Sequence, residues 1–86
     1  MSVIKVAAKS RTSSVAGAIA GVIRDNQRVE VQAIGAGAAN QAIKAIAVAR
    51  GYLLEEDVDI VCIPSFVEVD IDTQERTAVK ILVETR

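Results

Sequence analysis

The sequence predicts an α/β domain in two layers, with the element order strand, helix, strand, helix, strand, strand. Three observations favour it: short apolar runs that suit strands, two longer stretches with helical spacing of apolar residues, and a final pair of strand-like runs joined by a polar turn. Parallel strands joined by helices use right-handed crossovers, so both helices are expected on one face of a four-stranded mixed sheet. The 86 residues make a single domain, residues 1–86.

The strands are expected at residues 3–8, 29–34, 58–71 and 77–84. The first is short and rich in small apolar side chains, whereas the second and the fourth alternate along their length. Pro64 interrupts the third strand, and because proline cannot donate a ladder hydrogen bond, it belongs on a sheet edge or at a bulge. Residues 72–75 are polar and form the turn of a hairpin between the last two strands.

The first helix is expected over residues 14–25, with Thr12 or Ser13 able to cap its N-terminus. Gly17 and Gly21 lie four residues apart on one flank, which favours the close approach of another helix there. The buried stripe is formed by four apolar residues: Val15, Ile19, Val22 and Ile23.

The second helix has almost no polar face. It follows a turn at Gly35 and Gly37 and is expected to end at Arg50, with Gly51 as the C-terminal cap. A sheet covers only one face of a helix in a two-layer domain, so the remaining alanine surface is expected to meet another copy of the chain or a partner. The sequence therefore predicts a homodimer or a higher homo-oligomer.

Composition makes an enzyme the weakest of the functional classes. The chain has no histidine, which excludes a His-based triad or acid-base relay. The single Cys62 lies in an apolar run and is expected to be a buried core residue rather than a nucleophile. The carboxylates Glu68, Asp70 and Asp72 could in principle bind a metal, but a solvated edge of the hairpin explains them more simply. We expect neither a cofactor nor a metal.

A cytoplasmic location is expected. A lone cysteine fits a reducing interior, and the chain begins with a strand-like run instead of the basic and apolar segments of a signal peptide. No apolar stretch approaches the length needed to span a membrane without interruption. The net charge of −1 gives no long-range attraction to polyanions, so binding of nucleic acid would need a local cluster of cations.

The glycine turn before the second helix is one candidate anion site. Backbone N–H groups at a helix N-terminus attract phosphates, and Asn40, Gln41 and Lys44 project from the first turns. The turn lacks the Lys-Ser/Thr pair of a P-loop and the third glycine of a dinucleotide-binding motif. Glycines that only allow a sharp turn explain the sequence equally well, and both interpretations stay open.

The loop Lys9-Ser10-Arg11 is the second candidate. It follows the first strand, and in this topology it ends at the same edge of the sheet as the glycine turn. A solvated loop that caps a helix is the simpler interpretation of this segment alone. Two neighbouring loops with anion-binding groups make a shared site equally plausible.

Four segments together resemble the stage V sporulation protein S (SpoVS) family over nearly the whole chain: KVAAKSRTSSVAGAIAGVIR, VQAIGAGAANQAIKAIAVARGYL, VDIVCIPSF and ERTAVKILVE. This family is similar in strand order and loop placement to the Alba family of dimeric nucleic-acid-binding chromatin proteins. The resemblance implies an Alba-like fold, a dimer or higher assembly, and a role in bacterial developmental regulation such as sporulation and septation.

The resemblance also implies nucleic-acid binding, with departures from the Alba pattern. Lys9 matches the first of two adjacent lysines in Alba proteins, Ser10 occupies the second position, and Arg11 is a possible substitute. Gly35 and Gly37 stand where Alba proteins often carry arginines, and Gln41 replaces a lysine. The hairpin that is basic in Alba proteins is acidic here, with Arg76 its lone cation. Because each lost phosphate contact lowers affinity, weaker or single-stranded RNA binding through the two loops is expected.

The sequence thus favours a dimeric regulator that binds DNA or RNA through the loop after the first strand and the N-terminus of the second helix. The competing hypothesis is a protein-interaction or scaffold module that binds no nucleic acid, and a small-anion-binding domain is a third. The predicted nucleic-acid-binding residues are Lys9, Ser10, Arg11, Gly35, Gly37, Asn40, Gln41 and Lys44.

Overall fold

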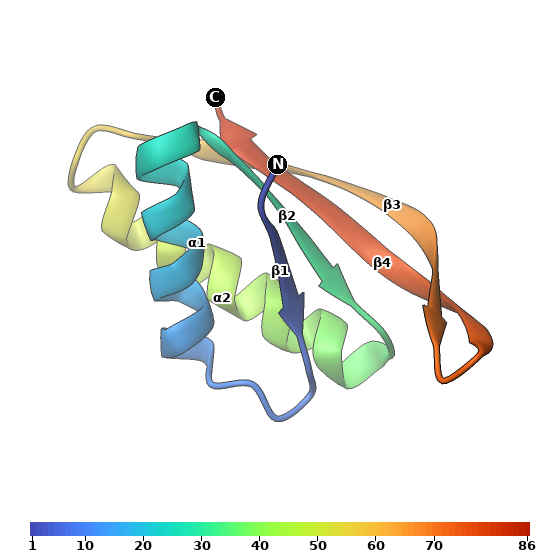
Figure 1. The fold of residues 1–86 in the computed structure, drawn as a ribbon. Helices are drawn as coiled ribbons and strands as arrows, with labels where there is room; N and C mark the ends of the chain where they lie inside the picture. The colour runs from blue at the N-terminus through green and yellow to red at the C-terminus, as the bar shows by residue number, and fades with distance from the viewer.

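The structure is a computed structural model that describes all of residues 1–86. Its elements are β1 (Val3–Val6), α1 (Thr12–Asn26), β2 (Arg28–Ala33), α2 (Ala36–Leu54), β3 (Ile60–Ile71) and β4 (Gln74–Thr85). They form one mixed sheet in the order β1-β2-β4-β3, in which only β1 and β2 run parallel. Both helices cover the same face of the sheet (Figure 1). The predicted element order and two-layer architecture are confirmed.

The core lies between the helices and the two central strands. Alternation on β2 points Val29, Val31 and Ala33 toward the helices, and the antiparallel register sets Val83 and Ile81 of β4 opposite the two valines. Every buried residue is aliphatic, and no buried side-chain polar atom lacks a hydrogen bond. Because these side chains are small, the two layers pack closely without aromatic residues.

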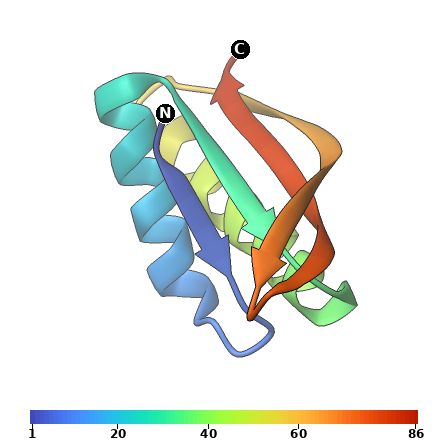
Figure 2. The same cartoon turned by 45° about the vertical axis from the view of Figure 1, so that its right-hand side comes forward.

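The β3–β4 hairpin extends well beyond the rest of the sheet. β4 pairs with β3 from Gln74 to Thr85 but with β2 only from Val79 to Glu84. The projecting part of β3 bends, so that its end comes to lie beside the end of β1 (Figure 2). Pro64 sits on β3, which is an edge strand as expected.

The start of α1 differs from the prediction. The helix begins at Thr12 with Arg11 as the N-cap residue, and no side chain caps it. The predicted caps at Thr12 or Ser13 are therefore wrong, since both residues lie inside the first turn. Neither hydroxyl caps the free backbone N–H groups of the first turn of α1. Thr12 Oγ1 accepts a hydrogen bond from Gln41 instead.

The helix α2 continues one turn past its predicted end. Gly51 lies inside the helix, which runs to Leu54. The fully buried side chain of Leu53 packs into the core, and the backbone N–H of Val58 donates to the carbonyl of Leu53. This tertiary packing outweighs the modest helix penalty of one glycine.

Two further predictions about packing are wrong. A Cβ added at Gly17 or Gly21 would meet no atom within 4 Å, so no neighbouring backbone approaches α1 at its glycines. Cys62 is exposed instead of buried, because the edge strand β3 extends beyond the cover of the helices. Partial burial of the Cys62 side chain still raises the pKa of its thiol.

Neither helix combines the length and the apolarity that crossing a bilayer requires.

Candidate nucleic-acid interface

The loop after β1 and the beginning of α2 are in direct contact. Gln41 Nε2 on α2 donates to the carbonyl oxygen of Ser10 at 2.8 Å and to Thr12 Oγ1 at 3.3 Å. The Ser10 hydroxyl in turn accepts from the backbone N–H of Ala7 at 2.9 Å, which closes a tight turn. The two loops are thus tied side by side at one end of the molecule, away from both termini (Figure 1).

The two glycines at the start of α2, Gly35 as its N-cap residue and Gly37 in its first turn, are each required for a different structural reason. Gly35 has a φ of 89°, a left-handed conformation that side chains disfavour. A Cβ on Gly37 would lie 3.1 Å from Cβ of Ala8, so the absence of a side chain lets the loop after β1 approach α2 closely. Both glycines therefore shape the contact between the loop after β1 and the start of α2. Their backbone N–H groups lie at the N-terminus of that helix.

Both helix N-termini lie at this end and lack a side-chain cap. The first turns of α1 and α2 also contain no acidic residue. The first N–H groups of a helix have no acceptor within it, and the helix dipole adds partial positive charge at the same place. The end of the molecule that carries the two loops therefore presents two unneutralised positive helix ends.

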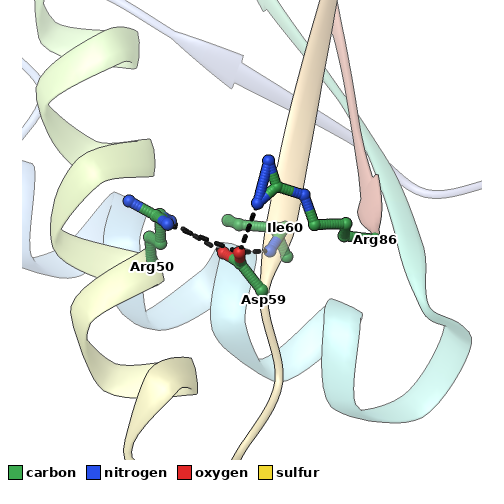
Figure 3. Close-up of polar contacts among 4 residues, drawn as sticks. All are labelled: Arg50, Asp59, Ile60 and Arg86. Atoms are coloured by element: carbon green, nitrogen blue, oxygen red, sulfur yellow. Dashed lines mark hydrogen bonds and ion pairs between the residues drawn. The ribbon is translucent and has the colours of Figure 1, made fainter.

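The cations of the chain divide into two groups, those that form an ion pair within the protein and those that do not. Five are ion-paired: Arg24 with Glu56, Arg28 with Glu84, Lys80 with Glu30, and both Arg50 and Arg86 with Asp59. Figure 3 shows the Asp59 cluster, where hydrogen bonds from Arg50 and from the Ile60 backbone lower the pKa of Asp59 to about 2. The five cations without an ion pair are Lys5, Lys9, Arg11, Lys44 and Arg76.

Four of the unpaired cations belong to the end that carries the two loops. Lys9 and Arg11 lie in the loop after β1, Lys44 lies one turn beyond Asn40 on α2, and all of these side chains are exposed. We call the surface formed by Lys9, Arg11, Asn40 and Lys44 the loop-end surface. Lys5 lies near this end but on the face of the sheet opposite the helices. Arg76 lies apart from it, on the hairpin.

The predicted site residues fall into two roles. Lys9, Arg11, Asn40 and Lys44 are exposed and available to a ligand. Ser10, Gln41, Gly35 and Gly37 hold the two loops together, which the sequence alone did not reveal. Sequence reasoning did not select Lys5, because the first strand was considered for its small apolar side chains and only the loop after it for its cations. The alternation that buries Val6 exposes Lys5, and this signal could have identified it.

The hairpin carries no comparable cationic surface. Glu68, Asp70, Asp72 and Glu75 are exposed, and Glu68 accepts a hydrogen bond from Thr77 at 2.8 Å. No group of three metal-ligating side chains gathers there or elsewhere.

The family model described as "Stage V sporulation protein S (SpoVS)" matches residues 2–86. The chain belongs to this family. Membership in the SpoVS family connects it with sporulation and agrees with the resemblance seen in the sequence.

Among solved structures, this SpoVS chain is similar to Alba from Thermoplasma volcanium. The two are 15% identical, the alignment covers 95% of this chain and 98% of that chain, and the TM-score is 0.61. At this identity the likeness is one of fold, and it shows that the SpoVS chain has the Alba-like fold.

Large apolar side chains remain exposed on both layers of the molecule. On α2 these include Ile43 and Leu54, and on β3 they include Ile63 and Phe66, of which Phe66 is 78% exposed. Ile43, Ala47 and Leu54 share one flank of α2 by their spacing. Exposed apolar area of this kind on a small domain is typical of an interface.

Proposed function

We propose that this SpoVS-family protein is a developmental regulator of sporulation and septation that acts as a dimer and binds nucleic acid through the loop-end surface. The observation that supports this most is the distribution of unpaired cations. At the opposite end every arginine is neutralised by a carboxylate, whereas the three cations of the loop-end surface have no partner and lie beside two uncapped helix N-termini. Phosphates fit such a surface.

The binding is electrostatic and moderate in strength. The loop-end surface offers Lys9, Arg11 and Lys44 as phosphate contacts, with Asn40 as a neutral donor, and the acidic hairpin adds none. Three or four neutralised phosphates give a dependence of log affinity on log salt with a slope of roughly −2 to −3 for single strands. Binding should therefore be clear at low salt and weak at physiological salt.

Fluorescence anisotropy with a short labelled RNA across salt concentrations tests this proposal. Lys9→Gln or Arg11→Gln should weaken binding several-fold and reduce the salt slope by roughly 0.7 for each lost contact. Lys80→Gln is the matched control, because it removes the same charge from a lysine that pairs with Glu30. Equal effects of Lys9→Gln and Lys80→Gln, or no binding at low salt, would remove the loop-end surface as the site.

A protein-interaction module without nucleic-acid binding is the second candidate function. The exposed apolar side chains of α2 and β3 favour it, because exposed apolar area on a small domain is typical of an interface. This function and the first one share the expected homodimer. They differ in the anisotropy experiment, where a scaffold gives no signal at any salt concentration.

A further inference from the structure

A pocket lies between the ends of β1 and β2 and the bent end of β3. Its volume is about 350 Å³, within the range of small-molecule sites. The bend in β3 creates this space, because it carries the hairpin toward the end of β1 (Figure 2). Most of the lining is aliphatic and includes Ala7, Ile34, Val69 and Ile71.

The strand register shows which side chains face this pocket. Lys5 on β1 lies opposite Gln32 on β2, and both alternate with core residues, so they lie on the face of the sheet that the helices leave open. Gln32 is paired in turn with Lys80, which places the even-numbered residues of β4 on the open face. Val69 and Ile71 of β3 are paired with even-numbered residues of β4 and therefore lie on the same face.

Lys5 is the charged side chain that this pocket presents to a ligand. It lines the pocket and forms no ion pair within the protein. The carboxylate of Glu30 lies on the same face, but Lys80 and the amide of Gln32 already hold it. Asp70 borders the pocket, yet by alternation its carboxylate lies on the other face of the hairpin. The pocket therefore combines an aliphatic wall with one positive charge that has no counterion.

We propose that this pocket binds a small aliphatic carboxylate, such as a medium-chain fatty acid. The aliphatic wall removes the chain from water, and the ammonium group of Lys5 pairs with the carboxylate. A second copy of this face would set one Lys5 against another, so charge favours an anionic ligand over self-association. No aromatic side chain lines the pocket, so it lacks the stacking platform that an unstacked base needs.

This site is independent of the proposed nucleic-acid binding. None of the four residues of the loop-end surface lines the pocket. Failure of either proposal therefore leaves the other standing.

A titration of the full chain with octanoate, below its micelle concentration, tests the site. Proton–nitrogen correlation spectra should show saturable shifts at residues 5–8, 32–34 and 69–71, the segments that form the pocket. Hexanoate should bind roughly tenfold more weakly than octanoate, because each buried methylene contributes about fourfold. Acetate, which has the charge without the chain, should cause no saturable shift.

Lys5→Gln tests the charge. It should lower the affinity for octanoate roughly threefold to fivefold, the size expected of a partly exposed ion pair. The affinity for octanol, which has the same chain length without a charge, should stay nearly unchanged. The comparison of the two ligands separates the loss of the ion pair from any change in the shape of the pocket.

Ile71→Glu tests the aliphatic wall. A carboxylate at this position should abolish octanoate binding, because it desolvates poorly and repels the ligand. Ile63→Glu is the matched control: Ile63 is also an exposed isoleucine on the open face of β3, but it lies outside the pocket. The same spectra show that both variants are folded.

Three results would each overturn the carboxylate site. The first is the absence of saturable shifts with octanoate, and the second is shifts confined to the exposed flank of α2. The third is a Lys5→Gln variant that loses affinity for octanol as much as for octanoate.

Discussion

Asp59 is held by two arginines and a backbone N–H at the end of the sheet away from the loop-end surface. Arg50 Nε donates to Oδ1 at 2.7 Å, and Arg86 Nη1 donates to Oδ2 at 2.9 Å (Figure 3). These groups join the end of α2, the start of β3 and the C-terminus. A single carboxylate therefore ties together three segments that are distant in the sequence.

The pKa of Asp59 makes the stability of the fold depend on pH. The pKa is lowered from 3.8 to about 2, so the folded state binds this proton more weakly than the unfolded state. The stabilisation is present above pH 4 and is lost as the pH falls toward 2. Asp59→Asn should lower the melting temperature at pH 7 and flatten its fall between pH 4 and pH 2. Thermal melts followed by circular dichroism measure both.

Asp25→Asn is the control for this prediction, because Asp25 is exposed and forms no ion pair. A variant of Asp59 that melts with the same pH dependence as the unmodified protein would contradict it.

Gln41 is the residue that connects the two loops. Gln41→Ala would leave the carbonyl of Ser10 without its donor and should destabilise the fold by about 1 kcal/mol. It should also weaken RNA binding by loosening the loop that carries Lys9 and Arg11. Urea unfolding measures the first effect and anisotropy the second. Asn40→Ala is the neighbouring control for stability, since Asn40 is exposed and forms no intramolecular hydrogen bond through its side chain. A loss of stability from Asn40→Ala as large as that from Gln41→Ala would contradict this role.

At the scale of elements, replacing Gly35 at the N-cap of α2 and Gly51 inside α2 by alanine should change the stability of the protein in opposite directions. Gly35 precedes the helix at a φ of 89°, so Gly35→Ala imposes backbone strain and should cost about 1 kcal/mol or more. Gly51 lies in the helix interior, where a Cβ meets no atom within 4 Å. Gly51→Ala should stabilise the protein by about 0.5 to 1 kcal/mol because alanine favours the helix. Urea denaturation midpoints of the two variants provide the comparison.

The same pair tests where α2 ends. If the helix stopped at Arg50, as the sequence suggested, Gly51 would be a C-terminal cap and Gly51→Ala would destabilise the protein. Stabilisation is expected only when the helix continues to Leu54. The sign of one substitution therefore distinguishes the two boundaries.

At the scale of the whole molecule, the exposed flank of α2 should form the homodimer. Ala47 is exposed and shares this flank with Ile43 and Leu54. Ala47→Glu places a charge there without disturbing the core, and it should convert a dimer into a monomer. Light scattering coupled to size exclusion measures the mass. Ala18→Glu, at an exposed position on α1, is the control and should remain a dimer. A monomer for the unmodified chain would contradict the prediction.

Patterns in the sequence determined the architecture. Alternation and helical spacing are local properties, so the second strand was identifiable before any contact was known. The buried stripe of α1 was only half right: Ile19 and Ile23 are buried as predicted, but Ala16 and Ala20 fill the other core positions and Val15 and Val22 are partly buried. Right-handed crossovers then placed the helices on one face, and the lack of a donor on Pro64 limited that residue to an edge strand or a bulge. Because β1 and β2 are parallel, the loops that follow them had to meet at one edge of the sheet.

Only the tertiary structure decided which charged side chains form ion pairs and which do not. Ion pairs such as Arg24–Glu56 join residues 32 positions apart, and no local pattern indicates them. The same holds for Gln41, whose hydrogen bonds to Ser10 and Thr12 join segments about 30 residues apart in the sequence, and for Cys62, whose exposure depends on how far the helices extend over β3. The bend of β3 beside β1 is likewise a property of the packed sheet. Distances between remote segments exist only after folding, and they separate the cations that stabilise the fold from those that remain for a ligand.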